Sequence, residues 1–446
     1  MCRAALAALA SLVLTFALPA TASAAPTWLA PQVISAAGQD ARDPGVALSP
    51  QGDAIAIWRR FDGSNWRIEA AFRPAGGSFG TAQTLSAAGR DAEQPKASLD
   101  SQGNAVAVWR RFDGSNWRIE AAFRPASGAF GPAQRLSADG EDADGPRVAV
   151  DPQGNAVAVW RRTDGSGTRI EAAFRPAGGV FGAPQPISPT GETTGLPTIG
   201  VPDVAIDPQG NATAVWSGPG DKDPHLGVIE AAFKPAGGPF GPPQRISEED
   251  AYVPVVGVDS QGNAIVAWER YVGTFRIETA YRPVGGFFGA PEFVSLQNRE
   301  ANGARVAVNP AGDAVLVWRR SHGDISAEAA FRPAGGLFGE PKLLTAPGQN
   351  IFRIEVAIDP QGNAMVVWQL SKGLDQRIEV SRRAAGGDFG APQLISDPSQ
   401  AARDPAIATD SQGNAAVVWQ RSDGTNQRIE AAGFDAAGPQ LRNLSI

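Results

Sequence analysis

The stretch VAVDPQGNAVAVWRR, residues 148–162, decides the fold. Two apolar runs of strand length flank the polar segment Asp151–Asn155. In that segment Pro152 presets φ for a turn and Gly154 accepts a positive φ, so the chain is expected to reverse there. The stretch therefore predicts a tight hairpin of two antiparallel strands.

The same stretch returns in recognisable form along almost the whole chain. A tryptophan marks its register in eight units, at intervals of 50 to 56 residues: Trp58, Trp109, Trp160, Trp216, Trp268, Trp318, Trp368 and Trp419. A regular period of this length is typical of repeat architectures. The eight units leave no room for a second domain, so we expect residues 25–446 to form one.

Each unit contains four apolar runs separated by turn residues. In the third unit the predicted strands are 147–151, 156–161, 169–175 and 184–188, which makes a four-stranded antiparallel meander. The strand 104–109 (NAVAVW) is apolar on both faces, as a sheet between two neighbouring sheets requires. We therefore predict an all-β fold, an eight-bladed β-propeller of four-stranded antiparallel blades with a repeat of about 51 residues.

The ring needs a fourth strand for its last blade, and both ends of the chain offer one. Residues 31–35 (PQVIS) copy an outer strand that has no blade of its own, and residues 439–446 (PQLRNLSI) compete for the same place. Both alternatives stay open at the level of the sequence.

The pattern P-x-V-A-V-D-x-x-G-N followed by an apolar strand resembles the repeats of secreted bacterial β-propellers of the NHL, YVTN and SBBP type, over about residues 30–435. That resemblance implies a blade and a binding scaffold, with enzymatic sites in a minority of such proteins. A weaker similarity links the turn to the Asp-box of sialidase-like propellers, S-x-D-x-G-x-x-W. In this chain the tryptophan follows the turn glycine by six positions, as in Gly154 and Trp160, and not by three.

Composition narrows the function classes. The 52 glycines and 36 prolines exclude long helices, and the net charge of −7 with a pI near 5.1 argues against nucleic acid as a partner. Cys2 is the only cysteine, so no disulfide is expected.

The first 24 residues resemble a secretory signal peptide. Arg3 precedes an apolar run from Ala4 to Leu18, and Ala22-Ser23-Ala24 forms a small-residue cleavage site. We therefore expect cleavage after Ala24 and a secreted, extracellular monomer. The apolar run is short for a membrane span, and no similar run follows it.

Residues that recur in every unit are expected to be structural. A glutamate occupies the same place on the third strand of all eight units (Glu69, Glu120, Glu171, Glu230, Glu278, Glu328, Glu379 and Glu430), and cross-strand ion pairs with arginine explain it. A turn aspartate recurs in six units and fits an Asx-type turn. Calcium is the open alternative at these turns, since carboxylates are its preferred ligands.

A localised site is expected where units depart from the pattern. In the fourth unit both the loop before the blade and the hairpin after Trp216 are longer, and the fifth unit holds all three tyrosines of the chain, among them Tyr252 and Tyr271. These departures fall on the propeller face that carries the loops between blades, where carboxylates are frequent and suit a cation or a polyhydroxyl ligand. The candidate ligand-binding residues are Glu192, Asp221, Asp223, His225, Tyr252, Glu269 and Tyr271.

Enzyme motifs are missing from the sequence. There is no G-x-S-x-G elbow, H-E-x-x-H helix or phosphate-binding glycine loop, and the two histidines are about two units apart. We therefore name no catalytic residue, no metal ligand and no required cofactor. The sequence favours a secreted module that binds carbohydrate or an extracellular protein at the mouth of the propeller channel. The alternatives are a sialidase-like glycoside hydrolase or another propeller enzyme, and a structural protein of the cell envelope or matrix.

Overall fold

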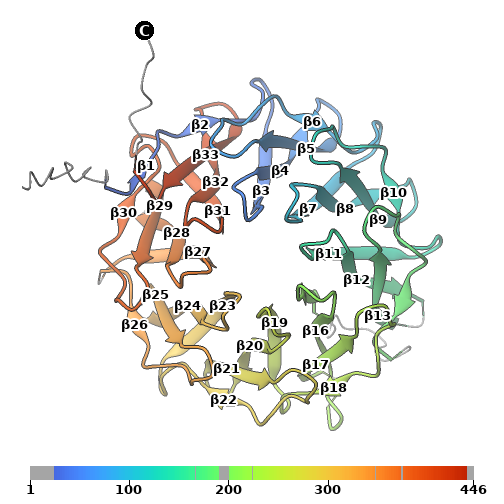
Figure 1. Cartoon of the computed structure of the whole chain (residues 1–446), viewed down its shortest axis with the longest axis vertical. Helices are drawn as coiled ribbons and strands as arrows, with labels where there is room; N and C mark the ends of the chain where they lie inside the picture. The colour runs from blue at the N-terminus through green and yellow to red at the C-terminus, as the bar shows by residue number, and fades with distance from the viewer. Residues whose placement is uncertain are drawn as a thin grey trace, which may run out of the picture.

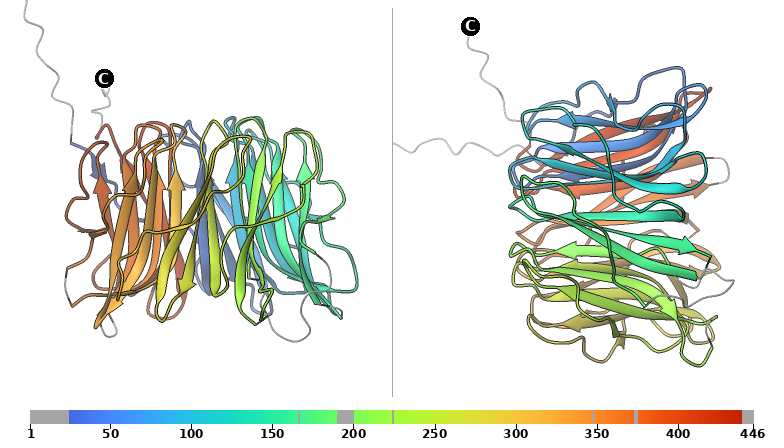
Figure 2. Two further views of the ribbon diagram at one scale, coloured as in Figure 1. Left: turned by 90° about the horizontal axis from the view of Figure 1, so that it is seen from below. Right: turned by 90° about the vertical axis from the view of Figure 1, so that its right-hand side faces the viewer.

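The computed structural model describes residues 25–165, 167–189, 200–223, 225–346, 348–372 and 375–438. Eight antiparallel sheets surround a central axis, as Figure 1 shows. Their strands run between the two faces of the ring (Figure 2). The predicted eight-bladed β-propeller is therefore confirmed. Nowhere in these ranges is there a helix long and apolar enough to cross a membrane.

Each blade begins with an inner strand next to the axis and continues outward through a long second strand (Figure 1). The inner strands are β3 (Ala41–Leu48), β7 (Ala92–Leu99), β11 (Asp142–Val150), β15 (Asp203–Ile206), β19 (Ala251–Val258), β23 (Glu300–Val308), β27 (Asn350–Ile358) and β31 (Ala402–Thr409). The second strands are β4 (Ala54–Phe61), β8 (Ala105–Phe112), β12 (Ala156–Asp164), β16 (Ala212–Pro219), β20 (Ala264–Tyr271), β24 (Ala314–His322), β28 (Ala364–Lys372) and β32 (Ala415–Ser422).

A third strand and a short outer strand complete each blade. The third strands are β5 (Trp66–Arg73), β9 (Trp117–Arg124), β13 (Gly167–Arg175), β17 (Gly227–Lys234), β21 (Phe275–Arg282), β25 (Asp324–Arg332), β29 (Asp375–Arg383) and β33 (Gln427–Asp435). The outer strands of the first seven blades are β6 (Gln83–Thr84), β10 (Gln134–Arg135), β14 (Gln185–Pro186), β18 (Gln244–Arg245), β22 (Glu292–Phe293), β26 (Lys342–Leu343) and β30 (Gln393–Leu394).

The N-terminal segment closes the ring. Strand β2 (Gln32–Val33) pairs with β33 of the eighth blade in the register that outer strands have elsewhere, and β1 (Thr27–Trp28) extends the same edge. The Ser35 hydroxyl accepts a hydrogen bond from the Ile429 amide at 2.9 Å. Of the two candidate closing strands, residues 31–35 thus fill the place; the rival segment 439–446 lies outside the described residues.

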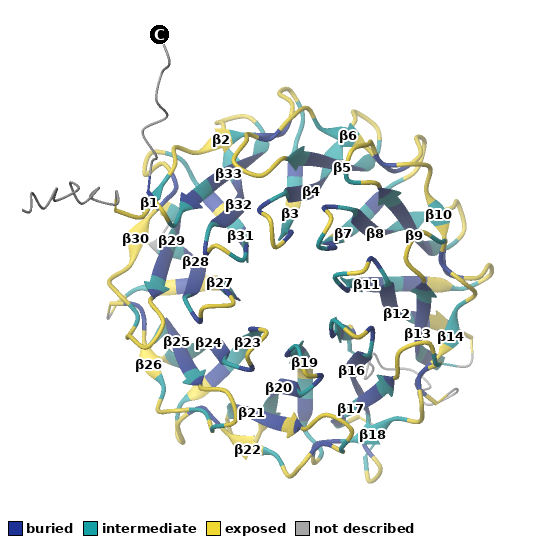
Figure 3. Ribbon diagram, in the orientation of Figure 1, coloured by how far each residue is buried: buried dark blue, intermediate teal, exposed yellow. Residues whose placement is uncertain are grey.

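The hydrophobic core lies between blades (Figure 3). Alanines and the tryptophan of one blade pack against the Val, Ile and third-strand residues of the blade before it, as Trp109 does with Ile57 and Ile68. All eight register tryptophans are fully buried. The apolar pattern on both faces of the second strand is explained by this nesting of small against branched side chains.

The recurring glutamate binds the recurring tryptophan. In every blade the glutamate Oε2 accepts a hydrogen bond from the indole Nε1, over 2.7 to 3.2 Å. Arginines lie within 4 Å of the glutamate in blades 1, 2, 3, 6 and 8. The predicted ion pairs are therefore present in those blades, and the indole contact, which the sequence did not reveal, is present in all eight.

The recurring turn aspartate holds its own turn together. In the second blade Asp100 Oδ1 accepts hydrogen bonds from the amides of Gln102 and Asn104, and Oδ2 accepts one from the Asn104 side chain at 2.6 Å. Asn104 Oδ1 in turn accepts the Ala126 amide of the next turn. The aspartate is therefore the acceptor of an Asx-type turn, as predicted.

Candidate functional site

A cavity of about 540 Å³ occupies the central channel. The inner strands β3, β7, β11, β27 and β31 contribute to its wall, and Arg305 of β23 reaches it as well. Most inner strands carry a β-bulge near their start, where the register against the second strand shifts. A bulge of this kind bends the strand and changes the directions of the side chains next to it.

One repeat position differs from blade to blade: the inner-strand residue that pairs with the residue before the register tryptophan. We call these eight residues the channel ring: Gly45, Lys96, Arg147, Asp203, Val255, Arg305, Glu355 and Ala406. The residues that hold neighbouring blades together hardly vary between units, whereas the ring contains three cations, two anions and three uncharged residues. Because these positions are equivalent in the repeat, a change of charge from blade to blade indicates that the blades have different roles at the channel wall.

The charges of the ring interact within it and across it. Arg305 Nε donates to Glu355 Oε1 at 3.0 Å, and Arg147 lies 3.9 Å from Asp203. Burial raises the pKa of Asp203, although Arg147 opposes the shift. Protein surrounds the amine of Lys96 although water reaches the side chain, and this desolvation, together with Arg147, lowers the pKa of Lys96 to about 8.

Lys96 has no counter-ion at close range. In the part of the chain that the structure describes, no carboxylate lies within 4.0 Å of its Nζ. A cation that water reaches and that has no counter-ion is available to a ligand, because an acceptor group of the ligand can replace that water with a charge-assisted hydrogen bond. The channel is therefore the concave, polar region of the molecule best suited to ligand binding.

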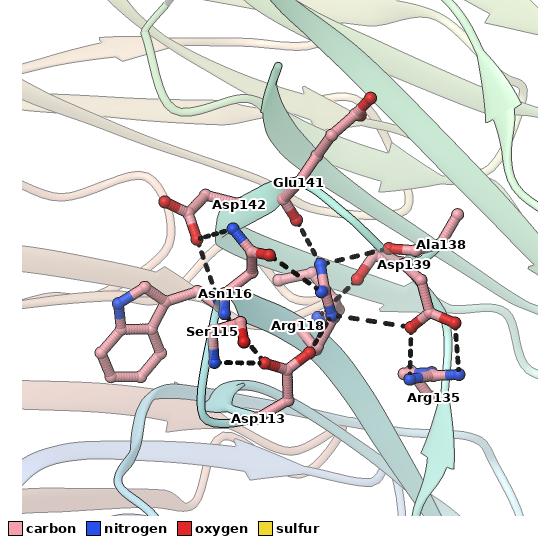
Figure 4. A network of polar contacts seen from close by, with 12 residues as sticks. Asp113, Ser115, Asn116, Arg118, Arg135, Ala138, Asp139, Glu141 and Asp142 are labelled. Carbon is pink, nitrogen blue, oxygen red and sulfur yellow. Dashed lines mark hydrogen bonds and ion pairs between the residues drawn. The ribbon is translucent and has the colours of Figure 1, made fainter. Parts of the chain in front are cut away.

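Carboxylates around the loop-bearing face have structural partners. Figure 4 shows Asp113 at the hairpin between β8 and β9, where the amides of Ser115 and Asn116 donate to Oδ1 at 2.8 Å and lower its pKa to about 2. Asp142 from the next inter-blade region accepts the Trp117 amide at 2.8 Å. Arg118 also pairs with Asp113. Asp113 thus stabilises its own hairpin, and Asp142 joins blade 3 to blade 2.

Several of the predicted site residues come together between blades 4 and 5. His225 is exposed and donates its amide to Asp223 Oδ1 at 2.9 Å, while Asp221 forms an ion pair with Arg245. The hydroxyl of Tyr252 lies 3.2 Å from Asp250. Burial raises the pKa of Tyr252, and the carboxylates of Asp250 and Asp223 add to the shift.

Two other predicted residues lie on the same face, and one falls outside the structure. Tyr271 is exposed and packs edge-on against Phe275, which also contacts Tyr252. Glu269 turns away from this group, because its Oε1 accepts the Gly303 amide of blade 6 at 2.7 Å. Burial raises the pKa of Glu269. Glu192 lies outside the described residues.

The charged members of the channel ring were missed in the sequence. The signal was present, because Lys96, Arg147, Asp203, Arg305 and Glu355 depart from one another at a single position of the repeat. An insertion that lengthens a loop is a stronger sequence signal than a variable position inside a strand, so the prediction was placed at the longer loops. Within the described ranges, no three His, Cys, Asp or Glu side chains are placed to hold a metal ion.

Comparisons with known proteins support the fold. No family model matches the sequence, and no curated protein matches it. A lectin from Burkholderia pseudomallei has a similar structure, with a TM-score of 0.54 and 14% identity over 80% of this chain and 100% of that one. The β-propeller domain of the Trilobed protease from Pyrococcus furiosus gives a TM-score of 0.49 at 8% identity, over 81% and 98% of the two chains.

A sialidase from Streptococcus pneumoniae aligns with a TM-score of 0.40 at 9% identity, over 91% of this chain and 70% of the sialidase. At 14% identity the likeness to the lectin concerns the fold alone and leaves the activity open. The likeness to the lectin, together with the ring of seven four-stranded sheets and one five-stranded sheet, establishes that the chain has a β-propeller fold.

Proposed function

We propose that this chain is a secreted, non-catalytic binding module of the NHL-like repeat type, whose ligand enters the central channel from the face that carries the inter-blade loops. The observation that carries the proposal is the channel ring. It lines a cavity of about 540 Å³ with charges that differ between otherwise equivalent blades. A ring that served only as a spacer would have no need for such differences.

The chemistry of the wall suits a polar extracellular ligand. The ring contains lysine, arginine and carboxylate side chains together with apolar and glycine positions, so a polyhydroxyl ligand meets both donors and acceptors there. Carbohydrate is therefore the ligand class that we favour. The predicted cluster of Asp223, Tyr252 and Tyr271 lies on the same face and offers aromatic surface and acceptors to a longer ligand.

A thermal-shift screen of residues 25–446 against soluble neutral and acidic polysaccharides, sialosides, calcium and a chelator tests the proposal. A ligand that binds only the folded state raises the unfolding midpoint. Lys96→Glu reverses a charge inside the channel and is expected to weaken binding at least tenfold. The control is Lys342→Glu, the same change on the exposed outer strand β26, which is expected to leave binding unchanged.

Three outcomes would contradict the proposal. Binding that is insensitive to Lys96→Glu would move the site away from the channel. Failure of every ligand in the panel would favour a structural role in the cell envelope or matrix. Release of new reducing ends from a bound polysaccharide would show an enzyme of the glycosidase or lyase class and would exclude the non-catalytic assignment.

A further inference from the structure

A second cavity, of about 250 Å³, opens beside the channel between blades 6 and 7. We call it the arginine pocket: Gly303, Arg305, Arg319, Phe352, Arg353 and Ile354 line it. Arg305 and Arg353 also line the channel cavity, so the two spaces are contiguous. Three guanidinium groups therefore converge on one wall, although positive charges repel one another.

Arg319 occupies the position that directly follows the register tryptophan, and other blades provide an internal comparison. Arginine also stands there in blades 1, 2 and 3, where each one pairs with a carboxylate. Arg59 lies 2.6 Å from Asp43, Arg110 lies 2.6 Å from Glu93, and Arg161 lies 2.7 Å from Asp144. These pairs set the ordinary arrangement for an arginine at this position.

Blade 6 lacks the carboxylate. The residue opposite Arg319 on the inner strand is Asn302, whereas Asp144 stands opposite Arg161 and Glu93 stands opposite Arg110. Across the described ranges, no carboxylate oxygen lies within 4.0 Å of the Arg319 guanidinium. Its hydrogen-bond acceptor is the carbonyl oxygen of Phe352, at 3.1 Å.

The surroundings keep the Arg319 guanidinium beside the pocket without neutralising it. Burial lowers the pKa of Arg319, and Arg353 and Arg305 lower it further, while Glu269 has the opposite effect. Glu269 is engaged elsewhere, since its Oε1 accepts the Gly303 amide at 2.7 Å. A Cβ atom at position 303 would lie 2.9 Å from Arg319 Nε. Glycine at this positive-φ position therefore avoids a clash with the guanidinium group of Arg319.

The other two arginines keep donors in reserve. Arg305 contacts Glu355 at 3.0 Å and Arg353 contacts Asp404 at 3.2 Å. A guanidinium carries five N–H donors, so one carboxylate contact does not exhaust it. An oxyanion in the pocket would accept charge-assisted hydrogen bonds from Arg319 and from these two residues.

We propose that the arginine pocket binds an oxyanion group, a carboxylate or a sulfate, of the ligand that occupies the channel. The proposal rests on the proposed function and specifies the chemistry of its ligand. Because residue 302 is asparagine, Arg319 lacks the cross-strand carboxylate that Asp144 provides in blade 3, and the oxyanion of the ligand takes that position. Specificity follows, because a neutral analogue leaves Arg319 without an anionic partner.

Calorimetry with matched probes tests the inference. Methyl β-D-glucuronide and methyl β-D-glucoside differ in one carboxylate, and inorganic sulfate is the minimal anion; all are measured at constant ionic strength. The glucuronide is expected to bind at least tenfold more tightly than the glucoside. If inorganic sulfate raises the unfolding midpoint, the site also accepts sulfated ligands. Equal affinities of the two glycosides, or no binding of either anion at 10 mM, roughly the weakest affinity of interest, would overturn the inference.

Two variants locate the site. Arg319→Gln is expected to weaken glucuronide binding about tenfold, whereas Arg110→Gln, at the same position of blade 2, is expected to change it less than twofold. Glutamine suits the position, because Gln369 and Gln420 occupy it in blades 7 and 8. Asn302→Asp recreates the pair of blade 3 and is expected to abolish the preference for the glucuronide while the unfolding midpoint is retained or raised.

The outcomes separate this inference from the proposed function. In one outcome, Lys96→Glu weakens the binding of the panel polysaccharides, while Arg319→Gln and Asn302→Asp leave glucuronide affinity unchanged. The anion site is then refuted, and the proposed binding module of the channel stands. If glucuronide binding depends on Arg319 but not on Lys96, the arginine pocket stands and the wider channel site fails.

Discussion

The recurring glutamate allows a stability prediction that compares two blades of one molecule. In blade 3 the side chain of Glu171 is 3% exposed and accepts from Trp160 Nε1 at 3.1 Å, while Arg162 and Arg169 each lie 3.0 Å from it. In blade 7 Glu379 has the same indole contact, at 3.1 Å, and none of the described arginines within 4 Å. We predict that Glu→Ala costs more stability in blade 3.

The magnitudes follow from what each substitution leaves behind. Glu379→Ala leaves one buried indole N–H without an acceptor, which costs about 1–3 kcal/mol of unfolding free energy. Glu171→Ala also removes a buried carboxylate from Arg162 and Arg169, which keep Glu141 as a partner. Its cost is therefore expected near the lower end of the about 3–5 kcal/mol for breaking a buried ion pair. Glu171→Gln keeps an oxygen that can accept from the indole and is expected to fall between these values.

Guanidinium-induced unfolding, followed by the fluorescence of the buried tryptophans, measures these differences from the shift in midpoint and the slope. Circular dichroism of the variants under native conditions controls for loss of the fold. Equal costs in the two blades, or a cost below about 1 kcal/mol for Glu171→Ala, would refute the view that the glutamate anchors both the tryptophan and the arginines.

Three further predictions concern titration and ring closure. Burial raises the pKa of Glu379, so the folded state prefers the neutral form of this side chain. The wild type is therefore expected to lose stability relative to Glu379→Gln as the pH rises from about 4 to 7. Denaturant titrations at several pH values that showed no such trend would contradict this prediction. Lys96, with its pKa lowered to about 8, is expected to titrate in nitrogen NMR well below the ordinary lysine value of about 10.4. Titration of Lys96 near the ordinary value would argue against desolvation of its amine. A chain that begins at Ala36 lacks strand β2 and the buried Ile34, and it is expected to lose more than about 2 kcal/mol of unfolding free energy, measured by chemical unfolding. Addition of a peptide of residues 25–35 is expected to restore that stability. Unchanged stability of the shortened chain would mean that the N-terminal strand does not close the ring.

Much of the fold was predictable because the blade repeats its chemistry. Trp160 and the turn Asp151–Asn155 return in register, so hairpin, strand count and ring size follow from one unit. The strand 104–109, apolar on both faces, also predicted a sheet packed between two neighbours, and the packing of Trp109 on Ile57 of the preceding blade confirms it. Repetition turns a weak local signal into a strong one.

The channel was not predictable from the same signals. The bulges before Lys96 and Arg147 contain residues as different as Gln94 and Gly145, both with a positive φ. A proline directly precedes Lys96 and Arg147, but the repeat pattern leaves the residue after that proline unspecified. The first strand of the third unit was accordingly predicted to begin at residue 147, whereas β11 begins at Asp142, ahead of the bulge. The pairing of Arg319 depends on its cross-strand neighbour, which only the register identifies.

Closure by the first strand of the chain sets the order in which this ring is completed. The Ser35 hydroxyl and the Ile429 amide that bond across the closure are 394 residues apart in sequence. Contacts of such high sequence separation form late and slow the folding of a chain, because a very long loop must close before they form. A nascent chain therefore holds its first strand unpaired until the last blade has emerged. Slow refolding, with a final phase that reports on the eighth blade alone, is the kinetic signature that this topology implies.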